Sequence, residues 1–222
     1  MLYLYAITDA SKPPRATGLH GASVDAICVG ALAAIVSEHD DLAPRVDEQA
    51  MWAHEAVVEA LMLDASVLPV RFATVLDDAE TVEAMLRDRG PEFRRALDRV
   101  RGAVEVGVRI TIDDERSDAT AVGEDSDVGP GTAYLLRRVE RTCRAEEAAK
   151  RIHEPLCALA LDHTRISASP RRPSLGAAYL VDAGQLDDFA TAAERLQAET
   201  EGVALVVTGP WPPYSFTSTE AR

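Results

Sequence analysis

Residues 104–112 read VEVGVRITI, and residues 113–128 read DDERSDATAVGEDSDV. In the first stretch, valine and isoleucine alternate with polar residues or glycine, which is typical of a strand with one buried face. The second stretch has seven acidic residues and one basic residue, with almost no large apolar side chains to bury. A strand followed by an acidic linker predicts a domain boundary. We therefore expect an N-terminal domain of residues 1–112, a linker of residues 113–128 and a C-terminal domain of residues 129–222.

The N-terminal half mixes strands with helices. Apolar runs predict strands, apolar residues three or four apart predict helices, and glycine and proline mark the ends of both. The expected elements are a strand at Leu2–Ile7, a hairpin of Val24–Val29 and Leu32–Val36 around Gly30-Ala31, a helix at Asp47–Met62 capped by Asp47, a strand at Val67–Leu76 containing Pro69, and a helix at Asp78–Arg101 split at Gly90-Pro91.

The C-terminal half has the same mixture and no convincing sequence repeat of the first. The expected elements are a long helix at Thr132–Leu161 bent at Pro155, strands at His163–Ala168 and Leu175–Val181, a helix at Gln185–Thr200 and a strand at Val203–Thr208. The pattern predicts an α+β fold with two small antiparallel or mixed sheets, each covered by helices on one side. The N-terminal domain is expected to be ferredoxin-like.

Composition excludes several classes of function. The net charge of −14 disfavours nucleic acid as a partner, because phosphate contacts need a basic face. The most apolar window, Val24–Val36, is broken by Asp25 and Gly30 and is too short for a membrane helix. The three cysteines are widely spaced and form no Cys-x-x-Cys pair, which favours a reducing, cytoplasmic location.

Sequence motifs for catalysis or cofactor binding are absent. There is no phosphate-binding glycine loop and no nucleophile elbow, and neither His54-Glu55 nor His153-Glu154 is followed by the second histidine of a zinc protease. The five histidines form no ligand-spaced pair, and His54 fits a structural role on the apolar side of its helix. We therefore predict no catalytic residue, no cofactor site and no metal site.

Arg71 lies inside the apolar run at Val67–Leu76, where a guanidinium must be paired or at a sheet edge. Glu105 is the one acidic residue in the 104–112 strand and is a candidate partner across the sheet. Three interpretations of Arg71 remain open: a structural ion pair with Glu105, a partner-binding arginine, or a catalytic arginine.

The C-terminal segment GPWPPYSF, Gly209–Phe216, combines three prolines with three aromatic residues. The prolines favour an extended path. Trp211, Tyr214 and Phe216 then either pack on a domain as a strap or present aromatic anchors to a partner, since these residue types are common at interface hot spots.

Two of these segments carry a family resemblance. VLPVRFATVL at Val67–Leu76 and GPWPPYSF at Gly209–Phe216 resemble two motifs of the gas vesicle protein F/L family. LYLYAI near the start, VEVGVRI at Val104 and GTAYL at Gly131 follow in the expected order, so the resemblance spans nearly the whole chain. The chain departs from the family pattern at Ala73, where the family usually has glycine. A glycine there would indicate a special backbone angle or a close contact.

The resemblance implies a non-enzymatic accessory protein of gas vesicle assembly with two α+β domains, located in the cytoplasm and at the gas vesicle. Its implied partners are the hydrophobic gas vesicle structural shell protein and other gas vesicle accessory proteins. Arg71, Glu105, Trp211, Tyr214 and Phe216 are the candidate partner-binding residues. Two other interpretations stay open: a small-molecule-sensing ferredoxin-like regulatory module, and an enzyme that uses Arg71 with a carboxylate.

Overall fold

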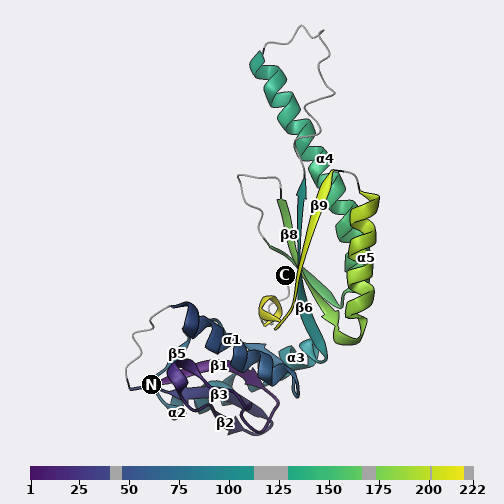
Figure 1. Ribbon diagram of the computed structural model, residues 1–222. Coiled ribbons are helices and arrows are strands. Elements are labelled where there is room, and N and C mark those ends of the chain that lie inside the picture. Colours follow the sequence, from purple (N-terminus) through teal and green to yellow (C-terminus); the bar gives the residue numbers. More distant parts are fainter. Residues whose placement is uncertain (41–46, 113–129, 167–173, 201, 218–222) are drawn as a thin grey trace. The chain divides into compact units, whose positions relative to one another are not determined.

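A computed structural model (Figure 1) describes residues 1–40, 47–112, 130–166, 174–200 and 202–217. The chain divides into two compact units, the first comprising Met1–Glu105 with Pro210–Arg222 and the second comprising Val106–Gly209. This division differs from the sequence-based boundaries because the C-terminal segment returns to the first unit. The predicted acidic linker, residues 113–128, lies outside the described residues, so its role as a linker stays a prediction.

The first unit is built on a mainly antiparallel sheet with the order β2-β3-β1-β4, in which β5 also pairs with β1. The central strand β1 pairs with β3 on one side and with both β4 and β5 on the other. A tight turn at Gly30, whose φ of 63° suits glycine, joins β2 and β3 as predicted. The strands are β1 (Leu2–Thr8), β2 (Asp25–Val29), β3 (Leu32–Glu38), β4 (Val67–Pro69) and β5 (Val75–Leu76).

The helices of the first unit begin and end where the sequence predicts. The carboxylate of Asp47 caps α1 (Glu48–Met62) by accepting a hydrogen bond of 2.7 Å from the backbone N–H of Ala50. The predicted split at Gly90-Pro91 separates α2 (Ala79–Asp88) from α3 (Gly90–Val100), since proline is tolerated in the first turn of a helix.

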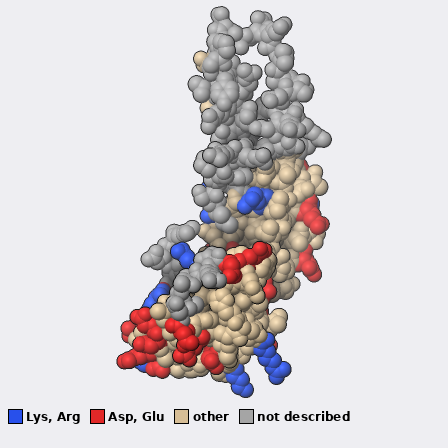
Figure 2. All heavy atoms as spheres, turned by 60° about the vertical axis from the view of Figure 1, so that its left-hand side comes forward, with Lys and Arg blue, Asp and Glu red and all other residues tan. Residues whose placement is uncertain are grey.

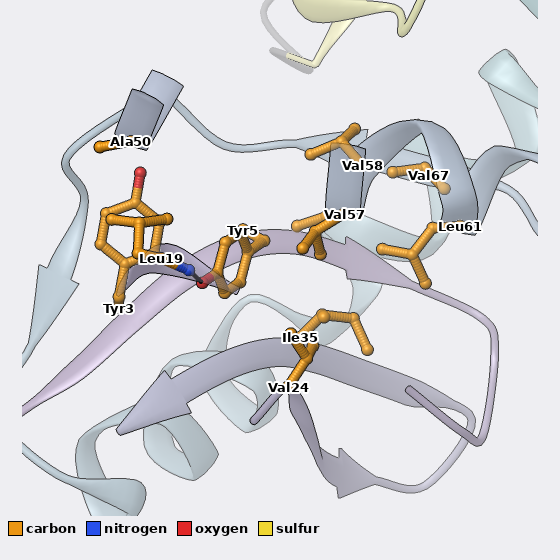
Figure 3. Packing of buried hydrophobic residues seen from close by; sticks show 11 residues of the cluster. Tyr3, Tyr5, Leu19, Val24, Ile35, Ala50, Val57, Val58, Leu61 and Val67 are labelled. Atoms are coloured by element: carbon orange, nitrogen blue, oxygen red, sulfur yellow. Dashed lines mark hydrogen bonds between the residues drawn. The ribbon is translucent and has the colours of Figure 1, made fainter. Parts of the chain in front are cut away.

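Helices cover both faces of this sheet, rather than the single face expected from the sequence. Every residue of β1 from Tyr3 to Thr8 is buried, as a strand covered on both faces requires. Tyr3, Tyr5 and Ile35 share one cluster with Val57 and Leu61 of α1 (Figure 3), and no residue of α2 or α3 belongs to it. The α2 and α3 helices instead contact β2, β3 and β4.

The second unit contains a sheet with the order β7-β8-β6-β9, and its two helices pack against each other and against β8 (Figure 1). Pro155 lies inside the long helix, as predicted. The elements are β6 (Ala103–Ile112), α4 (Pro130–Leu159), β7 (Asp162–Ile166), β8 (Ser174–Asp182), the short 3-10 helix η2 (Ala183–Gln185), α5 (Leu186–Glu199) and β9 (Val203–Trp211). The first unit has two further 3-10 helices, η1 (Leu19–Gly21) and η3 (Tyr214–Phe216).

The predicted α+β class with two small sheets is therefore confirmed. Across each sheet, the second strand in chain order comes first, followed by the third, the first and the fourth. The two sheets thus share one strand order, although the sequence shows no repeat. The second unit also follows the β-α-β-β-α-β succession of the ferredoxin-like motif. In the first unit, a loop with η1 stands between β1 and β2 where that motif has a helix, so the predicted ferredoxin-like N-terminal domain is not confirmed.

Candidate interaction site

The predicted strand at Val67–Leu76 is interrupted by a bulge of residues 70–74 between β4 and β5. The N–H of Val70 donates to the carbonyl oxygen of Tyr5 at 2.9 Å, and the N–H of Leu4 donates to the carbonyl oxygen of Thr74 at 3.0 Å. Between these two bonds, Ala73 adopts a φ of 67°, in the left-handed region that favours glycine. Its N–H donates to the hydroxyl of Tyr3 at 3.0 Å. The strand therefore leaves the sheet edge and returns to it.

Arg71 lies in this bulge and is exposed to solvent. Its carbonyl oxygen accepts a hydrogen bond from the hydroxyl of Thr74 at 2.7 Å, which stabilises the turn. Its guanidinium makes no ion pair with any residue that the structure describes. The expectation that Arg71 sits inside a strand is wrong, because the turn at Ala73 moves this segment out of the ladder.

Glu105 has a different partner from the one predicted. This β6 residue is 9% exposed, and its two carboxylate oxygens accept hydrogen bonds from the N–H and the hydroxyl of Ser215, both at 2.8 Å. Two donors aimed at one carboxylate stabilise its charge and offset the cost of burying it. The Arg71–Glu105 ion pair considered above is therefore not formed, and Glu105 instead holds the C-terminal segment to the first unit.

Tyr214 and Phe216 also fix the C-terminal segment to the first unit. The hydroxyl of Tyr214 donates to Glu55 of α1 at 2.8 Å, and burial raises the pKa of both groups. Phe216 is 2% exposed, and the guanidinium of Arg99 lies 5.9 Å from its ring centre. Tyr214, Ser215 and Phe216 therefore pack on the first unit, which agrees with the interpretation of this segment as a strap. Whether Tyr214 and Phe216 also bind a partner stays a prediction.

Trp211 differs from the other aromatic residues of the tail, since 46% of it is exposed. The same unit exposes large apolar side chains that sequence reasoning missed: Trp52 at 62% and Met51 at 46% in α1, and Leu63 at 84% just after that helix. Trp52 lies opposite the apolar stripe of α1, and this position was the available signal. Apolar side chains exposed in this way are characteristic of surfaces that bind other proteins.

A buried aromatic group lies beneath the strap. The hydroxyl of Tyr3 and Nδ1 of His54 are 2.9 Å apart, and the rings of Phe72 and Tyr214 lie 5.7 and 6.5 Å from the imidazole. Burial lowers the pKa of His54 to about 4, so the ring is neutral near pH 7. Full burial and a hydrogen bond to Tyr3 fit the structural role predicted for this histidine.

The charged surface is strongly biased. Figure 2 shows the densest acidic patch at the lower left of the face that it presents, with smaller acidic groups near the centre and at the right edge, whereas basic side chains on that face are few and scattered. This distribution agrees with the net charge of −14. An acidic surface keeps a protein with exposed apolar residues from associating with itself.

One group of side chains in the second unit has the donor atoms of a metal site. His153 and Cys157 of α4 and His163 of β7 each offer a ligand atom, and these atoms all lie within 4.8 Å of one another. The five histidines of the sequence form no ligand-spaced pair, yet the rings of His153 and His163 are 5.0 Å apart. Burial lowers the pKa of His153, which favours the neutral imidazole.

Solved structures share this fold. The structure superimposes on the crystal structure of the gas vesicle protein GvpF from Anabaena sp. PCC7120 with a TM-score of 0.84 and 21% identity, covering 99% of this chain and 97% of that one. GvpF from Microcystis aeruginosa gives a TM-score of 0.76 at 17% identity, with 98% of both chains covered. The two-unit α+β fold is therefore one found in gas vesicle proteins.

Sequence comparison then gives the family. Residues 1–218 match the model for the gas vesicle synthesis protein GvpL/GvpF, and the chain belongs to this family. Gas vesicle protein L of Streptomyces sp. (strain CB03234) is 32% identical over 96% of this chain and 91% of its own length. Gas vesicle protein F1 of Halobacterium salinarum is 27% identical over 97% and 92%.

The resemblance drawn from the two motifs is confirmed, and membership of this family implies a role in gas vesicle formation. Among the described residues, the helices are all too short or too polar to cross a membrane.

Proposed function

We propose that this protein is a non-enzymatic accessory protein of gas vesicle assembly that binds the hydrophobic shell protein, other accessory proteins, or both. We place this activity in the cytoplasm and at the growing vesicle. Membership of the GvpL/GvpF family over residues 1–218 is the observation that carries the proposal. A strongly apolar shell subunit needs a partner to cover it before assembly, and exposed apolar side chains on an acidic body suit that task.

Arg71 and Trp211 are the residues that we assign to partner binding. Of the five candidates, these two are exposed, whereas Glu105 and Phe216 are buried and Tyr214 donates to Glu55. Arginine and tryptophan are enriched among the residues that dominate binding energy at interfaces. The bulge around Ala73 presents Arg71 to solvent without a side-chain partner among the described residues, so its guanidinium is available to a carboxylate or carbonyl group of another protein.

The proposal includes no catalytic step. The enzyme interpretation needed Arg71 to act with a carboxylate, and Glu105 was its candidate. Because both oxygens of Glu105 accept hydrogen bonds from Ser215, this carboxylate is committed to the strap.

Point variants test the proposal better than removal of the C-terminal segment. Deleting that segment would leave Glu105 and Glu55 without their donors and would destabilise the first unit. We therefore suggest co-expression of the tagged full chain with the shell protein and the other accessory proteins, followed by quantitative pull-down. Arg71→Glu and Trp211→Ala are each expected to reduce recovery of at least one of these partners about tenfold. A tenfold change corresponds to a loss of roughly 1.4 kcal/mol of binding free energy, and a hot-spot residue contributes more than this.

The chain offers matched controls for both substitutions. Arg94→Glu changes the charge at an exposed arginine of α3, and Val139→Ala shortens an exposed apolar side chain of the second unit. Both control variants should retain the partner. Wild-type recovery with Arg71→Glu and Trp211→Ala would contradict the assignment of these two residues. Failure of the wild-type chain to recover any gas vesicle protein would contradict the proposed function itself.

A further inference from the structure

Three side chains of the second unit come together, and none of them is among the proposed interaction residues. His153 and Cys157 are four residues apart on α4, so they lie on the same side of the helix. His163 is in β7, and its position in the ladder is opposite Tyr179 of β8. The helix and the hairpin thus bring two imidazoles and one thiol together, with all ligand atoms within 4.8 Å.

The spacing of the donor atoms fits a tetrahedral metal site. The Sγ of Cys157 lies 3.5 Å from Nε2 and 3.6 Å from Nδ1 of His153. Bonds of about 2.3 Å from zinc to sulfur and about 2.0–2.1 Å to nitrogen, at a tetrahedral angle, separate the two ligand atoms by about 3.6 Å. Thiolate and imidazole are the donors that zinc and similar transition metals prefer, and the set contains no carboxylate that would favour calcium or magnesium.

A second hydrogen bond orients the buried histidine for this role. Nδ1 of His153 lies 2.5 Å from the hydroxyl of Tyr179, which is fully buried. Metal-binding histidines usually donate their other ring N–H to such a partner, which fixes the orientation of the ring. With Nδ1 bound to Tyr179, Nε2 is the nitrogen left to bind a metal ion. The ring of Phe189 lies 5.4 Å from that of Tyr179 and supplies an apolar surrounding.

We propose that His153, Cys157 and His163 form a binding site for one transition-metal ion of the zinc type. Three protein ligands leave the fourth tetrahedral position for water or for a donor from another molecule. Because His163 is exposed, that fourth position is reached from the solvent side. A bound ion joins the C-terminal part of α4 to the start of β7 and stabilises the second unit, independently of any function of Arg71 and Trp211.

Metal binding by the purified full chain tests this site. The protein is stripped with a chelator and titrated with Zn²⁺ by calorimetry and with Co²⁺ by visible absorption. We expect one equivalent of each ion to bind, a cobalt spectrum of a tetrahedral site with a sulfur-to-cobalt charge-transfer band, and a rise in Tm with Zn²⁺. Cys157→Ser should abolish the charge-transfer band, and Cys157→Ser and His163→Ala should each weaken Zn²⁺ binding at least tenfold.

Matched controls separate this site from incidental metal binding. Cys143→Ser changes an exposed cysteine elsewhere on α4, and His20→Ala changes a histidine of the first unit, so both should bind like the wild type. His163→Ala is informative because this exposed residue can be changed without opening the core; circular dichroism confirms that the variant folds. Absence of a tetrahedral cobalt spectrum would mean that Cys157 and His153 share only an S–H···N hydrogen bond, and the proposal would be wrong. Equal loss in the Cys143→Ser variant would also overturn it.

Discussion

The left-handed conformation of Ala73 makes a prediction about stability that is opposite to the usual effect of glycine. A residue with a Cβ atom costs about 1–2 kcal/mol in this region of the backbone map, and Ala73 has a φ of 67°. Replacing it with glycine removes that cost. Glycine also gives the unfolded chain more conformational freedom, which reduces the gain in stability by about 0.4–1 kcal/mol. We therefore expect Ala73→Gly to raise the free energy of unfolding by about 0.5–1 kcal/mol.

The matched control is the same substitution within a helix. Ala56 is exposed in the middle of α1, where glycine destabilises a helix by about 1 kcal/mol. The two alanine-to-glycine variants should thus differ by roughly 1.5–2 kcal/mol, with opposite signs relative to the wild type. A change of 1 kcal/mol shifts Tm by about 2–4 °C in a chain of this size.

Urea unfolding followed by tryptophan fluorescence measures this difference in the relevant part of the chain. The chain has two tryptophans, and Trp52 and Trp211 both belong to the first unit, as Ala73 and Ala56 do. Native-state hydrogen exchange at the N–H of Ala73, which is bonded to Tyr3, gives an independent measurement. If Ala73→Gly lowers the free energy of unfolding as much as Ala56→Gly does, the strain at this position is not real and the account of the bulge fails.

Three further predictions concern the strap and the buried imidazole. Phe216→Ala should cost about 3 kcal/mol of stability, whereas Trp211→Ala should cost about 1 kcal/mol or less; equal losses by urea unfolding would argue against a strap. Glu105→Ala removes the acceptor of both Ser215 hydrogen bonds and should cost about 2–3 kcal/mol, with faster proteolysis of the C-terminal segment; an unchanged cleavage rate would count against this anchor. Burial lowers the pKa of His54 in the folded chain to about 4 from an ordinary 6.5. Its contribution to the free energy of unfolding is therefore complete above pH 6.5 and is lost as the pH falls toward 4. Between pH 6.5 and pH 4, the free energy of unfolding should fall by up to about 3 kcal/mol less in the His54→Gln variant than in the wild type. Parallel curves of unfolding free energy against pH for the two proteins would refute this.

Local features of the fold could be predicted because their causes lie within a few residues. The cap at Asp47, the turn at Gly30 and the helix break at Gly90-Pro91 each depend on neighbouring side chains and backbone angles. The strand at Val67–Leu76 was predicted as continuous because its residues have high β propensity. Local propensity does not show that Ala73 donates its N–H to a tyrosine seventy residues earlier in the chain, and this contact is part of the turn.

The candidate interaction residues could be named from the sequence but not sorted. Three aromatic residues in GPWPPYSF look equivalent as possible anchors, yet Phe216 is 2% exposed and Trp211 is 46% exposed. The difference depends on contacts with distant parts of the chain, since Ser215 binds Glu105 across 110 positions and Tyr214 binds Glu55 across 159. The paired motifs placed the chain in its family without this information.

The sequence by itself determined the α+β class, the succession of helices and strands, the acidic character and the GvpL/GvpF family, because these depend on local pattern and on motifs. Only the tertiary structure decided that Arg71 is exposed, that Glu105 holds the C-terminal segment, and that His153 and His163 lie beside Cys157. Burial and hydrogen bonding of a side chain depend on which distant segments pack against it. Residues of the same type can therefore lie in the core or on the surface, and only the tertiary packing determines which of the two positions each one takes.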